Sequence, residues 1–172
     1  MFSSFFALAG AASWILVGGA VEDPYRLGEP LSDNTVVTDV PGLGTLRLDR
    51  DDAIYVTDLR ALAARTDPVA LDCLVNLTGG TPGATFALGA RPAGFPWLPG
   101  GYPGSQAMAE YVLDRTECLA GPVALLEAPD GARAIERPAV LADREFVVVG
   151  EVRYEGYLSE TQVLSVSEAP AG

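Results

Sequence analysis

The first 21 residues of the chain, Met1 to Val21, carry no charged side chain. A helix of about 20 residues spans roughly 30 Å, the thickness of the hydrocarbon core of a bilayer. Glu22, Asp23 and Pro24 then end the apolar run abruptly. This pattern predicts one N-terminal transmembrane helix, with the rest of the chain on one side of the membrane.

Two other interpretations of this segment stay open. Gly18-Gly19-Ala20 would suit a signal-peptide cleavage site, although no Lys or Arg precedes it. A buried helix of a globular domain is the second, but such a helix rarely runs this long without a polar anchor. In a membrane helix, small residues four positions apart let a second helix approach closely. The residues expected to contact a partner helix are Ala7, Ala9, Ala11, Ser13 and Trp14.

The chain then divides into an anchor (1–21), a juxtamembrane connector (22–34), a β-rich domain (35–168) and a polar tail (169–172). The domain lacks the basic residues that hold a loop in the cytoplasm, which favours an extracytoplasmic, periplasmic location. An even number of cysteines, Cys73 and Cys118, favours a disulfide over two buried thiols. Such a bond would close a loop of about 46 residues and stabilise the fold by about 3–4 kcal/mol.

The charge and the missing residue types exclude several functions. The chain has 23 acidic and 11 basic residues, a net charge of −12, no His and no Lys. Nucleic-acid binding needs cations that neutralise phosphates, so it is not expected. The absence of His and Lys removes the Ser-His-Asp triad, Schiff-base chemistry and standard zinc sites. Carboxylate and hydroxyl chemistry remain, and no cofactor is predicted.

Alternation of polar and apolar residues predicts the first strands. Segments 35–40 and 44–48 precede a charged turn, Asp49 to Asp52, and a returning strand, Ala53 to Val56, so a β-hairpin is expected. Residues 58–66 fit a short helix capped by Asp58. The apolar run 69–78 suits a buried strand and contains a glycosylation pattern at Asn76.

The second half of the domain predicts antiparallel strands. A helix is expected to start at Ser105. Strands 123–127 and 132–136 flank the turn Ala128-Pro129-Asp130-Gly131, and strands 145–154 and 157–166 flank Glu155-Gly156. The expected fold class is therefore a transmembrane helix followed by a mainly β, α+β domain, built as an antiparallel sheet, small barrel or sandwich.

The run Val147-Val148-Val149-Gly150, followed by a hairpin and a last strand, resembles the closing strands of an OB-fold barrel. Haem chaperones with an anchored OB-like domain have a similar layout. They attach haem through His, which this chain lacks, so the resemblance implies a barrel and not their activity.

A long loop, 79–104, is rich in Pro and Gly and carries large apolar side chains. Aromatic residues dominate the cores of protein interfaces, so this loop is expected to contact another protein. A lid folded over its own core and a small-ligand site are the alternatives. The expected contact residues are Phe95, Trp97, Leu98 and Tyr102.

Three groups of acids are candidates for chemistry. Asp49, Asp51 and Asp52 could bind Ca²⁺ through oxygens, but a solvated hairpin tip is the simpler interpretation. The pairs Glu127 with Asp130 and Asp143 with Glu145 could serve glycoside hydrolysis, which needs both carboxylates in one cleft. Surface acids are far more common.

The expected function is a non-enzymatic accessory subunit of a larger membrane complex, by analogy an energy-transducing one, respiratory or photosynthetic. Its partners would be other membrane subunits and the lipid bilayer. An anchored binding or assembly-factor domain that acts transiently is the alternative, and a carboxylate hydrolase is the third.

Overall fold

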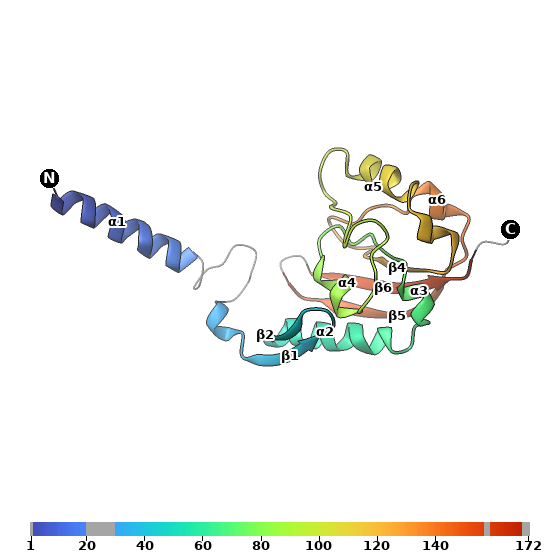
Figure 1. Cartoon of the computed structure of the whole chain (residues 1–172), viewed down its shortest axis with the longest axis horizontal. Coiled ribbons are helices and arrows are strands. Elements are labelled where there is room, and N and C mark those ends of the chain that lie inside the picture. Colours follow the sequence, from blue (N-terminus) through green and yellow to red (C-terminus); the bar gives the residue numbers. More distant parts are fainter. Residues whose placement is uncertain (1, 20–29, 157–158, 170–172) are drawn as a thin grey trace.

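The computed structural model of the chain describes residues 2–19, 30–156 and 159–169. Figure 1 shows the arrangement of the labelled elements. In chain order the elements are α1 (Phe2–Val17), η2 (Leu31–Asp33), β1 (Val36–Val40), β2 (Gly44–Leu48), α2 (Arg50–Ala63), α3 (Pro68–Leu71), β3 (Leu74–Asn76), α4 (Gly83–Ala87), α5 (Ser105–Leu113), η3 (Glu117–Ala120), β4 (Val123–Glu127), α6 (Ala139–Ala142), β5 (Val147–Tyr154) and β6 (Glu160–Ser167).

A four-stranded mixed sheet organises the domain, in the order β3-β4-β6-β5. β3 and β4 are parallel, with Leu74 opposite Ala124, whereas β4 and β5 both pair antiparallel with β6. Parallel neighbours need a long crossover, and here it contains α4, α5 and η3. The expected antiparallel barrel or sandwich, and with it the OB-like closure, is therefore wrong. β3 and β5 are the edges of an open sheet in the part of the chain that is described.

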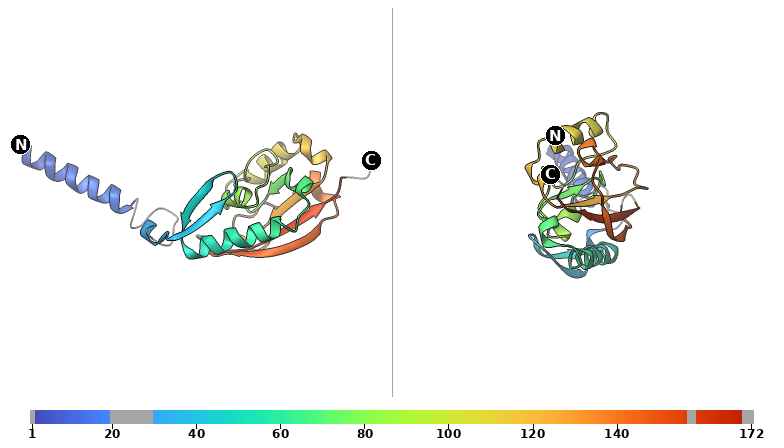
Figure 2. Two further views of the ribbon diagram at one scale, coloured as in Figure 1. Left: turned by 60° about the horizontal axis from the view of Figure 1, so that its bottom comes forward. Right: turned by 90° about the vertical axis from the view of Figure 1, so that its right-hand side faces the viewer.

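The sheet separates two apolar cores. Alternate residues of β4 point to opposite faces, so Ala124 and Leu126 join one core and Val123 and Leu125 join the other. α2 covers the first face, while α5 and α6 lie beyond the second (Figure 1). Figure 2 shows the same three layers from two further directions. The domain is therefore α+β, with helices on both faces of the sheet.

α2 replaces the turn and the returning strand that were predicted for residues 49–56. The Asp49 side chain accepts a hydrogen bond from the Asp52 amide at 2.8 Å and caps the helix. From there a stripe of buried residues at helical spacing, Tyr55, Val56, Leu59 and Leu62, packs on the sheet. Residues 53–56 form a short apolar run that suits a strand or a buried helix equally well, and the Asp49 cap decides for the helix.

The first two predicted strands pair with each other instead. β1 and β2 form an antiparallel hairpin in which Val36 is opposite Leu48 and Val40 is opposite Gly44. Gly42, at φ +74°, makes the tight turn possible. This two-stranded sheet packs on α2 and α2 packs on β5, so the hairpin extends the first layer.

The C-terminal predictions are largely confirmed. β4 occupies 123–127 as expected, α5 starts at Ser105, and β5 and β6 form the expected hairpin. Residues 132–136 are not a strand. The Ile135 amide donates a hydrogen bond to the carbonyl of Leu77, just after β3, at 2.8 Å.

The N-terminal helix is shorter than predicted. α1 has 16 residues, which rise about 24 Å and fall short of the roughly 30 Å hydrocarbon core. Among the described residues, no helix combines the length and the apolar character needed to cross a bilayer. The predicted transmembrane anchor, and the single-pass periplasmic topology that depended on it, are therefore not supported. The predicted connector 22–34 lies mostly outside the described residues.

Candidate functional site

The described part of the domain contains a pocket between the β1–β2 hairpin, the first turns of α2 and the segment that leads into α4. Its volume is about 230 Å³, and it is partly open to solvent. Most of its walls are apolar. The lining residues are Val40, Leu43, Leu46, Leu48, Asp52, Tyr55, Val56, Gly80, Thr81, Pro82, Gly83, Ala84 and Tyr154.

Three packed elements position these walls. Tyr55 and Val56 project from the buried stripe of α2, one turn after its cap. Leu46 and Leu48 lie on the hairpin strand that packs against the same core. Ala84 is buried at the start of α4. The pocket is thus a gap in a layer of packed elements, and its shape depends on the tertiary fold.

Asp52 is the one charged residue in the pocket wall. Its burial raises the pKa of the carboxyl to about 6, and the neighbouring charge and hydrogen-bonding of Asp49 add to this effect, with a smaller contribution from Asp51. In the described chain no Arg lies within ion-pair distance of Asp52. The pocket therefore holds an acid whose charge is not balanced by a cation.

Behind the pocket a buried hydrogen-bond network fixes its polar wall. The Tyr55 hydroxyl donates to Gln162 Oε1 at 2.6 Å. Gln162 Nε2 donates to Thr81 Oγ1 at 2.8 Å and to Glu160 Oε1 at 2.7 Å. Glu160 is 1% exposed, and burial raises the pKa of its carboxyl. The ring of Tyr154 lies 4.9 Å from that of Tyr55 between centroids, so the aromatic wall is also packed.

The network continues away from the pocket to the Pro-rich loop. Thr78 shares a hydrogen bond with Thr81 at 2.7 Å and donates to Asn76 Oδ1 at 2.7 Å. The Asn76 amide donates to the Thr81 carbonyl at 3.1 Å, and Thr85 donates to the Pro96 carbonyl. Asn76 is thus a buried structural residue, which rules it out as an accessible glycan acceptor in the folded domain.

The predicted contact residues of the loop do not form one exposed surface, because some are buried and others are exposed. Leu98 is 1% exposed and belongs to the core, and Trp97 is half-buried. Phe95 and Tyr102 are 51% and 54% exposed, and the guanidinium of Arg133 lies 5.5 Å from the Tyr102 ring centroid. The loop is therefore part core and part surface, and its contact with another protein stays a prediction.

Three of the five predicted contact residues of the N-terminal helix have described side chains. Ala11, Ser13 and Trp14 are exposed on α1, which lies apart from the other elements in Figure 1. The side chains of Ala7 and Ala9 lie outside what the structure describes. Ala11, Ser13 and Trp14 are not among the residues that line the pocket.

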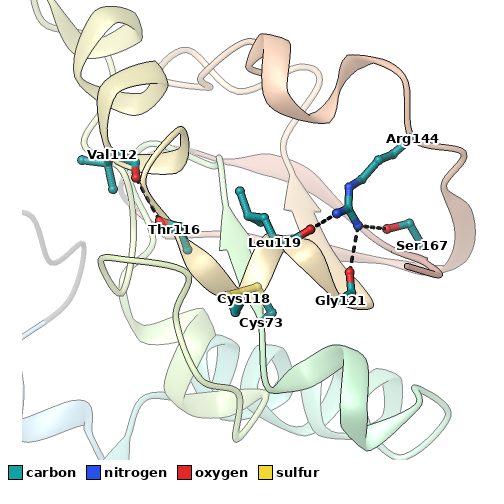
Figure 3. Close-up of a disulfide and its surroundings, with 8 residues drawn as sticks. All are labelled: Cys73, Val112, Thr116, Cys118, Leu119, Gly121, Arg144 and Ser167. Atoms are coloured by element: carbon teal, nitrogen blue, oxygen red, sulfur yellow. Dashed lines mark hydrogen bonds between the residues drawn. A yellow bond between two sulfur atoms is a disulfide. The ribbon is translucent and has the colours of Figure 1, made fainter. Parts of the chain in front are cut away.

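The predicted disulfide is present and links the start of β3 to η3. Cys73, just before β3, bonds to Cys118 in η3, with a Cα–Cα distance of 5.7 Å (Figure 3). Beside it, Arg144 donates to the carbonyls of Leu119 and Gly121 and to the Ser167 hydroxyl. Desolvation lowers the pKa of Arg144. This cluster clamps η3 to the sheet and is structural.

The remaining acidic candidates lie on the surface. Glu127 forms an ion pair with Arg137 at 2.7 Å, and Asp130 accepts a hydrogen bond from the Thr161 amide. No group of three or more potential ligands for a metal occurs among the described residues. The Asp49–Asp52 cluster is the start of α2 and not the predicted hairpin tip.

Sequence reasoning missed Tyr55, Thr81 and Gln162. An available signal was the spacing from Asp49 to Tyr55, Leu59 and Leu62, which fits a capped helix. No signal in the sequence pointed to Gln162, because a polar residue in a strand is normally assigned to the solvent face. Comparison with protein-family models, with curated proteins and with solved structures finds no match for this chain.

Proposed function

We propose that this chain is a non-catalytic module that binds a small, largely apolar molecule in the pocket beside α2. The observation that carries the proposal is the pocket itself, an apolar recess with one carboxylate and a fixed polar wall. Small-molecule sites typically combine apolar walls with a few placed polar groups. The volume is below the roughly 300–1,000 Å³ of drug-sized sites, so the ligand is expected to be small.

A preformed wall supports binding. The Tyr55 hydroxyl and the Gln162 amide already have partners inside the protein. A ligand need not order them, so little conformational entropy is lost when it enters. An apolar ligand that covers the apolar surface of the pocket removes that surface from water, which favours binding.

The same features favour binding over catalysis. The pocket wall has one carboxylate, whereas glycoside hydrolysis needs two that flank the bond. The chain has no His or Lys, so Asp52 is the one group in the described pocket wall that could act as a base near neutral pH. Burial raises the pKa of Tyr55, so its hydroxyl stays protonated. These observations keep the hydrolase hypothesis in third place.

Titration with neutral apolar probes of increasing size, benzene, indole and naphthalene, tests the proposal by amide chemical shifts. We expect shifts concentrated on the lining residues for the smaller probes. Gly83 lines the pocket, and a Cβ added there meets no atom within 4 Å. Gly83→Phe should therefore occupy the recess and weaken probe binding by about tenfold or more.

The matched control is Val140→Phe, an equally large aromatic addition on α6 at the opposite face of the sheet. It should bind the probes as the parent does. Shifts scattered over the molecule, or equal affinity in Gly83→Phe and the parent, would show that the pocket is not a binding site.

A second candidate function is contact with another protein through the Pro-rich loop. The exposed aromatic side chains of Phe95 and Tyr102 favour it, since such residues anchor interfaces. This is the predicted accessory role, carried by the loop and not by the N-terminal helix. The double substitution Phe95→Ser with Tyr102→Ser should release any stably co-purifying protein. It should change the free energy of unfolding by no more than about 0.5 kcal/mol.

A further inference from the structure

We infer that the ligand of the pocket carries a basic nitrogen that pairs with the carboxylate of Asp52 while its apolar body lies against the hairpin. This inference rests on the proposed binding function and names the chemical class of the ligand. It would make the pocket a site for small aromatic or branched aliphatic amines.

The position of Asp52 on the helix is the first argument. Asp52 is the third residue after the cap Asp49, the place where a capping box returns a hydrogen bond to the cap amide. In this structure the bond runs one way only, from the Asp52 amide to Asp49. The Asp52 carboxyl lies in the pocket wall, next to the Asp49 carboxyl, which raises its pKa by charge and by hydrogen bonding.

The charges around Asp52 give the second argument. From α2, Asp49 and Asp51 add negative charge, and from β5 the phenol of Tyr154 lines the same recess. The hairpin and the segment before α4 contribute no titratable side chain to the wall. A buried carboxylate without a cation is costly, and a paired one is much less so. A ligand cation would supply the missing partner, whereas a ligand anion would be repelled.

The walls give the third argument, because they suit the remainder of such a ligand. Leu46, Leu48 and Val56 present aliphatic surface, and Tyr55 and Tyr154 present aromatic surface close to the acid. A cation near an aromatic face gains further attraction. A short apolar chain or ring that ends in an ammonium group matches both parts of the pocket.

Three probes of nearly equal size separate charge from shape: 2-phenylethylamine, 2-phenylethanol and phenylacetate. Affinities are measured by amide chemical shifts and calorimetry at pH 7.5 on the full chain. We expect the amine to bind about tenfold more tightly than the alcohol, and phenylacetate to bind most weakly. Saturation with the amine should also lower the pKa of Asp52, because the cation stabilises the charged carboxylate.

Asp52→Asn should make the affinities of the amine and the alcohol equal. Asp58→Asn is the matched control, since it removes the same charge from an exposed position further along the same helix, outside the pocket wall. It should preserve the preference for the amine. Asp52→Ser serves as a second variant if the Asn side chain disturbs the pocket.

The outcomes distinguish the two proposals. If the alcohol binds the lining residues as tightly as the amine in the parent, the inference of a basic ligand is wrong and the binding function stands. If none of the three probes shifts the lining amides, the binding function fails and the inference fails with it. If Asp52→Asn still prefers the amine, Asp52 is not the group that pairs with the ligand, while the preference for a basic ligand stands.

Discussion

At the scale of single residues, Asp52 illustrates how a binding group can lower stability. Its carboxyl lies partly buried among apolar side chains, with two further acids nearby and no cation. Ionisation of this group is therefore easier in the unfolded chain than in the folded one. A neutral side chain at this position would give the folded domain a higher free energy of unfolding at neutral pH.

Replacing Asp52 by Asn should stabilise the domain at high pH. The pKa rises from 3.8 to about 6 on folding. Below pH about 4 the group is protonated in both states, and between about 4 and 6 only the unfolded chain loses its proton, so the free energy of unfolding falls as the pH rises. At pH 8 Asp52→Asn should be more stable than the parent by about 1–2 kcal/mol, after solvent screening at the pocket mouth.

Urea denaturation at pH 3.5 and pH 8 measures this difference. The two proteins should be nearly equal at the lower pH. A variant that is less stable than the parent at pH 8 would mean that the Asp52 carboxylate has a stabilising partner in the folded domain.

At the scale of elements, the start of α2 decides the character of the pocket. Asp49 caps the helix and also raises the pKa of Asp52. Cap and charge are separable, because Asn caps a helix about as well as Asp does but carries no charge. The short cap motif thus links the stability of a helix to the acidity of a pocket residue.

Asp49→Asn should therefore lower the pKa of Asp52 and leave stability almost unchanged at low pH, where the charge of Asp52 is absent. Asp49→Ala should lower the same pKa and also reduce the free energy of unfolding by about 1 kcal/mol through loss of the cap. Side-chain carboxyl shifts in an NMR titration give the pKa, and urea melts give the stability. Equal stabilities of the two variants would show that the cap contributes nothing.

The elements also show how far the sequence can predict this fold. β4, β5 and β6 were predictable because their residues alternate or are continuously apolar between clear turn signals. α2 was not, because the short apolar run from Ala53 to Val56 fits a strand as well as a helix, and the sheet that buries the helical stripe is distant in sequence. β3 has only three residues, and its parallel pairing with β4 is a long-range choice.

At the scale of the whole molecule, the disulfide restrains the longest connection in the sheet. Cys73 and Cys118 lie 45 positions apart, and the loop that their bond closes contains β3 and most of the crossover from β3 to β4. The intervening segment carries α4, α5 and the Pro-rich loop, and α4 forms part of the pocket wall. The bond therefore restricts the conformations that this segment can adopt in the unfolded chain.

The double substitution Cys73→Ala with Cys118→Ala should reduce the free energy of unfolding by about 3–4 kcal/mol, since a loop of this length loses much entropy on closure. Urea denaturation gives the value, and the parent under reducing conditions should unfold at nearly the same midpoint as the variant. A loss below about 1 kcal/mol would show that Arg144 and its carbonyl contacts already hold η3 in place.

The sequence by itself determined the acidic charge, the absence of His and Lys chemistry, the cysteine pair and the strongest strands. These properties depend on composition or on neighbours in the chain. Tertiary structure decided the mixed sheet and the pocket. Asp52, Tyr55, Thr81 and Gln162 come from three separate regions of the chain, and only the packing of α2, α4 and the sheet brings them together. A pocket is a place where packed elements leave space, and no local pattern in a sequence records that space.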